Sequence, residues 1–209
     1  MTKKDSLPSG LALEASTGDE LLALAMRQLD DGADFIKLYL DGPEVGVAPW
    51  TVHEVAAVVK GAAKRGKKVT AHSGNLAGAR VGVAAGVHSL EHGFELDADV
   101  CRDMATQGTF LVSTLAVMES WLSFGKTTEL PRFATDEGRL RIETRRDRAR
   151  ESVRLAHAAG VAICAGTDFG GGSLRANQLA WEVEALVAAG LEPWEAVGAA
   201  TWRGGTAKR

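Results

Sequence analysis

The chain has 209 residues, of which 45% are hydrophobic and 24% are charged, so it can bury the core of one domain and does not have a disordered composition. Its formal net charge of −3 gives no electrostatic reason to expect nucleic acid or an anionic membrane as a partner, and no segment approaches the roughly 20 apolar residues of a membrane span. The two cysteines, Cys101 and Cys164, form neither a disulfide framework nor a zinc-finger spacing, so we expect buried thiols in a cytoplasmic protein.

Helix-length and strand-length segments alternate along the chain. The strands are short apolar runs followed by glycine or serine turns, and the helices carry apolar residues at helical spacing. In chain order we expect a helix at 19–31, a strand at 34–40, a helix from 51 to a stop at 66, a strand at 68–72, a helix at 75–85, a strand at 87–92, a helix at 97–107, a strand at 109–114, a helix at 135–159, a strand at 161–167, and helices at 176–189 and 193–200.

Local signals fix the starts of the first two of these helices. Thr17 or Asp19 can accept hydrogen bonds from the free amide groups at the start of the first helix. Thr51 and Glu54 have the spacing of a capping box at the start of the second.

A long connection follows the strand at 109–114. Its apolar side chains predict either a lid over an active site or packing on the rim of the fold; they are Met118, Trp121, Leu122 and Phe124. The helix at 135–159 carries many arginines interleaved with Glu and Asp, which indicates a solvated, ion-paired face.

The repeat of strand and helix every 20 to 35 residues or so is typical of parallel βα units. Five strands are visible, whereas a closed (β/α)8 barrel has eight strands and about 250 residues. We therefore predict an α/β fold, a partial TIM (β/α)8 barrel with five parallel strands and intervening helices, in which residues 1–209 form one incomplete barrel domain.

Four side chains able to bind a metal or transfer a proton, Lys37, His72, His92 and Asp168, stand where short apolar runs stop. Parallel strands joined by helices bring their carboxyl ends to one face, so these side chains are expected to converge there. Their neighbours, Tyr39 and Ser73, are either substrate contacts or packing groups. The other histidines, His53, His88 and His157, are given no role.

Strand alternation indicates which residues share the interior face with the four. By this rule Phe35 and Tyr39 point with Lys37, Gly166 and Cys164 point with Asp168, and Leu90 and His88 point with His92.

The order and spacing of six segments resemble the amidohydrolase superfamily, within it the branch of imidazolonepropionase-like and Xaa-Pro dipeptidase-like enzymes. The segments are GADFIKLYL, KKVTAHS, GVHSLEHGFELD, GTFLVSTL, AGTDFGG and EAVGAATWRGGTAKR. The resemblance implies a barrel that holds one or two divalent metal ions. It makes Lys37, on strand four, a bridging ligand, His72 and His92, on strands five and six, ligands of the second metal, and Asp168, on strand eight, a ligand that also acts as the catalytic proton carrier.

The chemistry of these residues agrees with that implication. A lysine in a partly apolar site loses its charge readily, and the neutral amine can react with carbon dioxide to give the carbamate that the family suggests for Lys37. Imidazole and carboxylate ligands suit zinc, which we favour, and also manganese or iron. A metal-activated water would then hydrolyse the carbon–nitrogen bond of a small-molecule substrate, a non-peptide amide, a cyclic amide or a dipeptide.

One departure from the family pattern bears on activity: the family's strand-one His-x-His pair, which supplies the other metal's ligands, is absent. We therefore expect a fragment of a longer product that lacks the first three strands. The alternative is a catalytically inactive barrel fragment whose open sheet edges would favour a homo-oligomer. A third hypothesis treats Gly170 to Gly172 as a phosphate cradle.

Overall fold

The computed structural model describes residues 1–4, 12–44, 46–170, 173 and 177–207. Its centre is a five-stranded parallel sheet in the order β3-β4-β5-β6-β7, so neighbouring strands in the sheet are consecutive in the chain. These strands are β3 (Phe35–Tyr39), β4 (Lys68–Ser73), β5 (Ser89–His92), β6 (Phe110–Ser113) and β7 (Ile163–Ala165). The predicted partial barrel with five parallel strands is confirmed.

Helices precede the first strand of the sheet, connect each strand to the next and follow the last one, as the alternating pattern predicts. They are α1 (Gly18–Asp30), α2 (Val52–Ala63), α3 (Leu76–Ala84), α4 (Ala98–Gln107), α5 (Ala116–Phe124), α6 (Pro131–Ala134), α7 (Asp136–Ala158), α8 (Leu179–Ala188), α9 (Pro193–Ala200) and α10 (Trp202–Ala207). None of the described helices combines the length and the apolar composition that crossing a membrane requires.

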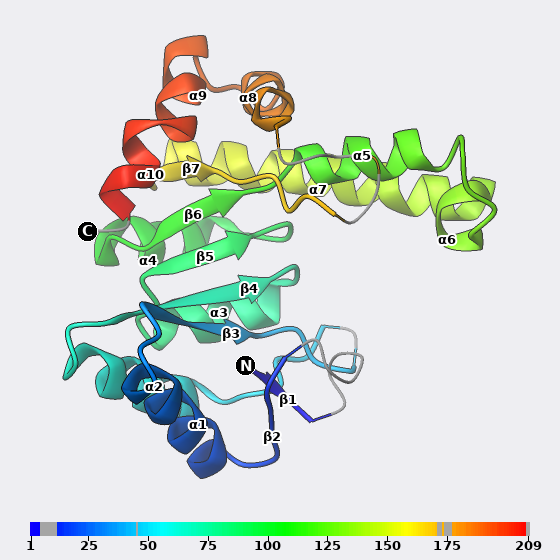
Figure 1. The fold of residues 1–209 in the computed structure, drawn as a ribbon. Coiled ribbons are helices and arrows are strands. Elements are labelled where there is room, and N and C mark those ends of the chain that lie inside the picture. The colour runs from blue at the N-terminus through cyan, green and yellow to red at the C-terminus, as the bar shows by residue number, and fades with distance from the viewer. Residues whose placement is uncertain (5–11, 45, 171–172, 174–176, 208–209) are drawn as a thin grey trace.

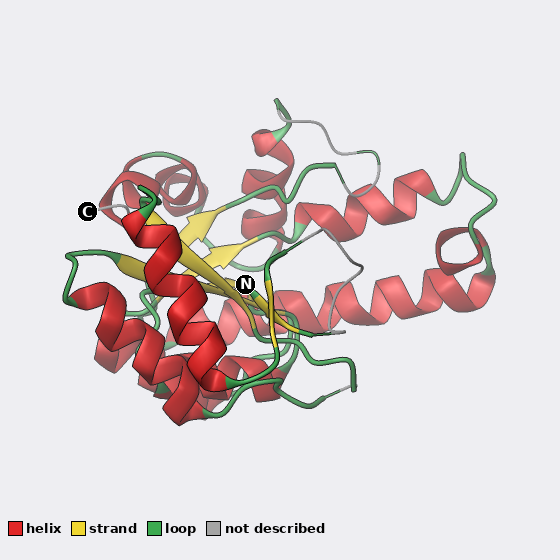
Figure 2. Ribbon diagram, turned by 60° about the horizontal axis from the view of Figure 1, so that its bottom comes forward, coloured by secondary structure: helices red, strands yellow, loops and turns green. Residues whose placement is uncertain are grey.

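The helices α3, α4 and α7 lie behind the sheet in Figure 1, and the strands form an open, curved layer in front of them. Figure 2 shows the same layer from another side, with α5, α6 and α7 extending beyond the strands. Two edges of the sheet remain, at β3 and at β7. A small parallel pair, β1 (Thr2–Lys3) and β2 (Glu14–Ala15), lies beside β3, where the amide of Tyr39 donates to the carbonyl of Met1 at 2.8 Å.

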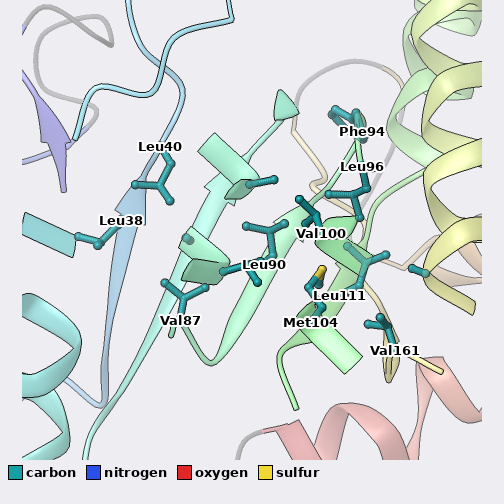
Figure 3. Packing of buried hydrophobic residues seen from close by; sticks show 14 of the residues in the cluster. Leu38, Leu40, Val87, Leu90, Phe94, Leu96, Val100, Met104, Leu111 and Val161 are labelled. Carbon is teal, nitrogen blue, oxygen red and sulfur yellow. The ribbon is translucent and has the colours of Figure 1, made fainter. Parts of the chain in front are cut away.

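The hydrophobic core lies between the sheet and its helices (Figure 3). Strand residues Leu38, Leu90 and Leu111 are fully buried in it, and α4 contributes Met104. On the opposite face of β3, Phe35 is 55% exposed. The alternation of buried and exposed residues therefore distinguishes a helix-covered face from an inner face that the described helices leave open.

Two predicted helix starts are confirmed by their hydrogen bonds. Thr17 Oγ1 accepts from the amide of Glu20 at 3.2 Å, so Thr17 rather than Asp19 caps α1. At α2 the amide of Thr51 donates to Glu54 Oε2 at 2.8 Å, and Thr51 Oγ1 accepts from the amide of Glu54 at 3.3 Å. The capping box is complete.

The connection after β6 differs from the prediction, because it contains two helices, α5 and α6. Met118 is fully buried, and α5 packs along α7. Trp121, Leu122 and Phe124 are partly buried against the same core. The structure therefore supports rim packing rather than a lid. Strands β1 and β2 and helix α10 were also not predicted. The predicted start of the helix at 176–189 lies outside the described residues, and α8 begins at Leu179.

Candidate metal site

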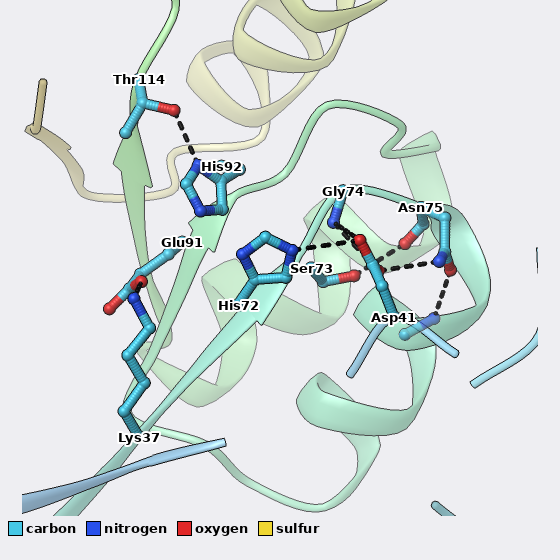
Figure 4. A network of polar contacts seen from close by, with 10 residues as sticks. Lys37, Asp41, His72, Ser73, Gly74, Asn75, Glu91, His92 and Thr114 are labelled. Carbon is cyan, nitrogen blue, oxygen red and sulfur yellow. Dashed lines mark hydrogen bonds and ion pairs between the residues drawn. The ribbon is translucent and has the colours of Figure 1, made fainter. Parts of the chain in front are cut away.

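Neighbouring strands bring His72 and His92 together at the carboxyl end of the sheet (Figure 4). Their ring centroids are 4.5 Å apart and the ring planes meet at 67°. His72 is half-buried, whereas His92 is only 6% exposed. The structure therefore brings these two imidazoles side by side, as the sequence predicts.

His92 reaches this position through an unusual backbone conformation. In the register of the parallel pair, His72 lies beside Glu91, and His92 lies beside Ser73. Simple alternation would therefore place His92 on the helix-covered face with Leu90, which is fully buried in the core. The φ angle of His92 is +70°, in the left-handed region, and His92 lies against His72 rather than in the core with Leu90. The prediction that Leu90 and His88 point with His92 is wrong for this reason.

Each of the two imidazoles uses one ring nitrogen in a hydrogen bond. His72 Nε2 lies 3.1 Å from Asp41 Oδ2, and His92 Nδ1 lies 2.8 Å from Thr114 Oγ1. Within the described part of the chain, no hydrogen bond occupies His72 Nδ1 or His92 Nε2. Metal-binding histidines in proteins have this arrangement, because an outer partner fixes the ring while the other nitrogen remains available.

Burial keeps His92 neutral. Burial, together with smaller electrostatic effects of His72, Lys37 and Arg145, lowers the pKa of His92 to about 3. A metal ligand must be the neutral imidazole, so His92 is in the state that coordination requires.

Asp41 is a site residue that the sequence reasoning missed. Its carboxylate accepts from the amide of Gly74 at 2.9 Å and from Asn75 Nδ2 at 2.7 Å, in addition to contacting His72. Asn75 in turn caps α3 by accepting from the amide of Gly78 at 2.8 Å. Asp41 is the second residue after β3, so its position just beyond a strand was the available signal.

Lys37 lies near the histidines but in a different environment from the one expected. It is the third residue of the five in β3, not at the end of the strand, and its side chain is 51% exposed. Its ammonium group forms an ion pair with Glu91, which also accepts a hydrogen bond from Thr70 Oγ1 at 3.2 Å. The expectation of a partly apolar site for this lysine is therefore wrong. Glu91 is a second residue that the sequence reasoning missed.

Asp168 lies in the loop after β7, which ends earlier than predicted, at Ala165. Asp168 is exposed and has a φ angle of +47°. Across the described residues it has no hydrogen bond or ion pair, so the structure does not join it to Lys37, His72 and His92. The same part of the chain contains no cluster of three His, Cys, Asp or Glu side chains that could hold a metal ion. The metal role of Asp168 stays a prediction.

A row of aromatic rings crosses the site from β3 to the loop after β5. Tyr39 stacks on His72 with centroids 4.0 Å apart, and Phe94 lies 5.2 Å from His92. Arg145, from α7, stands over Phe94 with its guanidinium carbon 5.0 Å from the ring centroid. Tyr39 therefore belongs to the site. The other candidate contact, Ser73, is fully buried and donates to the carbonyl of Asn75 at 2.8 Å, which is a packing role.

A buried carboxyl supports the loop that carries Thr114. Glu182, from α8, is fully buried and accepts from Ser113 Oγ at 2.6 Å and from the amide of Ala116 at 2.7 Å. These residues stand on either side of Thr114, whose hydroxyl contacts His92. Glu182 thus fixes the backbone on which the outer partner of His92 lies.

The predicted phosphate cradle lies partly outside the described residues, since only Gly170 of the three glycines is described. For a metal ion, the donor chemistry of His72 and His92 fits: both rings have an outer partner and a second nitrogen that no described residue contacts by a hydrogen bond. Lys37 could contribute a metal ligand only after its ion pair with Glu91 is broken.

Comparison with known proteins shows the family of the chain. The amidohydrolase family matches residues 3–207. An uncharacterized protein of Mycobacterium tuberculosis is 32% identical over 198 residues, covering 93% of this chain and 52% of that protein. Ochratoxinase of Aspergillus niger is 30% identical over 191 residues, covering 88% of this chain and 38% of the enzyme. The chain thus spans about half the length of these relatives or less.

Solved structures of barrel proteins superpose on most of the chain. A Xaa-Pro dipeptidase with bound methionine has a TM-score of 0.80 at 27% identity, covering 94% of this chain and 48% of that one. Aspergillus niger ochratoxinase has a TM-score of 0.79 at 26% identity, covering 99% and 47%. These neighbours are TIM-barrel amidohydrolases, and members of the family usually use metal ions. The chain therefore belongs to the amidohydrolase family, of whose barrel it contains five consecutive strands.

Proposed function

We propose that this chain is the metal-binding half of a hydrolase that cleaves the carbon–nitrogen bond of a small-molecule amide, cyclic amide or dipeptide. The observation that carries the proposal is the histidine pair, His72 and His92. One ring nitrogen of each is fixed by an outer partner, and the other has no hydrogen bond from the residues that the structure describes. Membership of the amidohydrolase family and the hydrolases among the solved neighbours support the reaction class.

In this proposal His72 and His92 hold a divalent cation, with zinc favoured because imidazole and carboxylate are borderline ligands. When bound, such a cation makes hydroxide available near neutral pH and polarises the carbonyl that is attacked. The protein's own contribution is orientation. Asp41 and Thr114 hold the two rings in place, and burial keeps His92 neutral at any pH at which the enzyme would work.

Lys37 is proposed to act as a carbamate formed with carbon dioxide. Only the neutral amine reacts with carbon dioxide, whereas Lys37 forms an ion pair with the Glu91 carboxylate. A carbamate is itself an anion, so Lys37 would have to leave Glu91 and turn toward the histidines. Asp168 is proposed to accept the proton of the attacking water and to deliver it to the leaving nitrogen.

A second candidate is a catalytically inactive barrel fragment. The state of Asp168 favours it, because this carboxylate is exposed and forms no hydrogen bond or ion pair with the histidines in the described part of the chain. An inactive fragment of this kind can still bind one cation through His72 and His92, whereas the hydrolase also needs the proton carrier.

Zinc titration of the metal-free chain, followed by calorimetry, tests the metal site. His72→Ala and His92→Ala each remove a proposed ligand and should weaken zinc binding at least roughly tenfold. Thr114→Val removes only an outer partner and should weaken zinc binding by at most roughly 10- to 100-fold, the usual range for such partners. His53→Ala, on the exposed surface of α2, is the control and should leave the affinity unchanged.

Lys37→Met should weaken zinc binding only when bicarbonate is supplied. Equal zinc affinity in the wild type and in the double variant His72→Ala/His92→Ala would refute the site, and zinc binding without amide hydrolysis would favour the inactive fragment.

A further inference from the structure

One arginine of α7 differs from all the others on that helix. Six of its seven arginines form ion pairs with Glu or Asp side chains, as the interleaved charges predict. The six are Arg139, Arg141, Arg146, Arg148, Arg150 and Arg154. Arg145 has no ion pair and no hydrogen bond within the described part of the chain, so the ion-paired interpretation of this helix is wrong for one residue.

Arg145 is also the arginine of α7 that reaches the histidine pair. Its guanidinium carbon lies 5.0 Å from the centroid of Phe94, whose ring is next to His92. A Cβ atom on Gly74 would stand 2.5 Å from Arg145 Nη2, so the glycine after β4 leaves room for the guanidinium. The charge of Arg145 acts on both His92 and Tyr39. The guanidinium therefore stands at the rim of the candidate site.

The carboxylate of Asp41, on this side of the site, already accepts hydrogen bonds from other groups. Asp41 accepts from the amide of Gly74, from Asn75 Nδ2 and at His72 Nε2. These contacts use its acceptor positions, and it forms no ion pair with Arg145. The exposed guanidinium thus keeps five N–H donors in a planar fork, the geometry that matches a carboxylate with two parallel hydrogen bonds.

We propose that Arg145 is a specificity-determining residue that binds a carboxylate of the substrate while the scissile bond lies over His72 and His92. The proposal rests on the proposed function, because it takes the histidine pair as the reaction site. Arg145 would thereby select among the substrates considered above. Amides that bear a carboxylate next to the reacting group would be bound, and neutral cyclic amides would not be favoured.

Binding of two matched probes to the metal-free chain tests the proposal without any requirement for catalysis. The probes are N-acetyl-L-leucine, which carries a carboxylate, and N-acetyl-L-leucinamide, which is neutral, both measured by calorimetry. The wild type should bind the carboxylate probe roughly tenfold more tightly, as expected for one charge-assisted pair, and added salt should reduce the difference. Arg145→Ala should abolish the difference, and Arg145→Lys should retain part of it, because a lysine keeps the charge but not the fork.

Arg148→Ala is the matched control, since Arg148 lies on the same helix and pairs with Glu95 at 3.0 Å. It should leave the preference intact. Equal binding of the two probes by the wild type, no binding of the carboxylate probe, or an unchanged preference in Arg145→Ala would each overturn the proposal. A preserved preference in a chain that hydrolyses no amide would overturn the proposed function alone.

Discussion

At the scale of single residues, the site depends on side chains whose state is set by burial and by partners distant in sequence. His92 stays neutral because it is buried, and its ring is held by Thr114 from the end of the next strand. Glu182, from α8, supports the loop that carries Thr114. Burial raises the pKa of Glu182 to about 7, and hydrogen bonds from Ser113 and from the amides of Ala116 and Leu115 only partly offset this effect. A fully buried carboxyl therefore titrates near neutral pH beneath the candidate site.

The raised pKa of Glu182 predicts a pH-dependent stability. Between its ordinary value of 4.5 and about 7, Glu182 holds a proton in the folded state that it has lost in the unfolded state, so its contribution to the free energy of unfolding falls as pH rises through this window. The difference between the two pKa values corresponds to about 3 kcal/mol in the free energy of unfolding. Urea unfolding across this range should show this loss in the wild type relative to Glu182→Gln, whose amide does not titrate. His92 contributes the opposite dependence between about 3 and 6.5, a range that overlaps this window, and it does so equally in both proteins. Parallel pH profiles for the two proteins would contradict the prediction.

At the scale of elements, the helices are placed by close contacts with the strands that they follow. Helix α3 begins directly after β4, and two of its glycines face Leu40, the residue after β3. A Cβ on Gly78 would stand 2.5 Å from the backbone carbonyl oxygen of Leu40 and 2.6 Å from Ser73 Oγ. A Cβ on Gly82 would stand 2.9 Å from Leu40 Cδ1, the end of a side chain. The first contact is rigid and the second can adjust.

This difference predicts opposite outcomes for two alanine substitutions in one helix. Helix propensity alone favours alanine over glycine by up to about 1 kcal/mol at either position. Gly78→Ala should nevertheless destabilise the protein by about 1 to 3 kcal/mol, because α3 must move away from the carbonyl of Leu40. Gly82→Ala should be close to neutral. Urea denaturation of both variants measures the difference, and equal stability of the two would show that α3 is not held against Leu40.

At the scale of the whole molecule, the sheet has two faces with different surroundings. The helices cover one face, and on the other Phe35 is 55% exposed beside Lys37. The described sheet ends at β3 on one side and at β7 on the other. An exposed aromatic residue on an uncovered face of a sheet is a site where chains associate. The expected homo-oligomer therefore has a specific candidate surface on the inner face of β3.

Phe35→Thr tests that surface. Threonine is compatible with a strand and removes the exposed ring, so the free energy of unfolding should change by less than about 1 kcal/mol while the fraction of monomer increases. Sedimentation velocity over a range of protein concentrations measures the change. Leu140→Gln, at a residue of α7 that is 63% exposed, is the control and should leave assembly unaltered. If Phe35→Thr assembles like the wild type, the inner face of β3 is not the contact.

The amino-acid sequence by itself determined the alternation of strands and helices, the five parallel strands and the caps of α1 and α2, because these depend on spacing and on neighbours within one turn. It also placed His72 and His92 at one face, since parallel strands share their carboxyl ends. Helix α5 was missed because its first amides bind Glu182, 66 residues further along the chain, instead of a local cap.

Only the tertiary structure decided how the site residues are arranged. Three features depend on groups from separate segments: the left-handed conformation of His92, the ion pair between Lys37 and Glu91, and the position of the Arg145 guanidinium over Phe94. Local patterns carry no information on such contacts, because burial and charge pairing are set by whichever side chains the folded chain brings together.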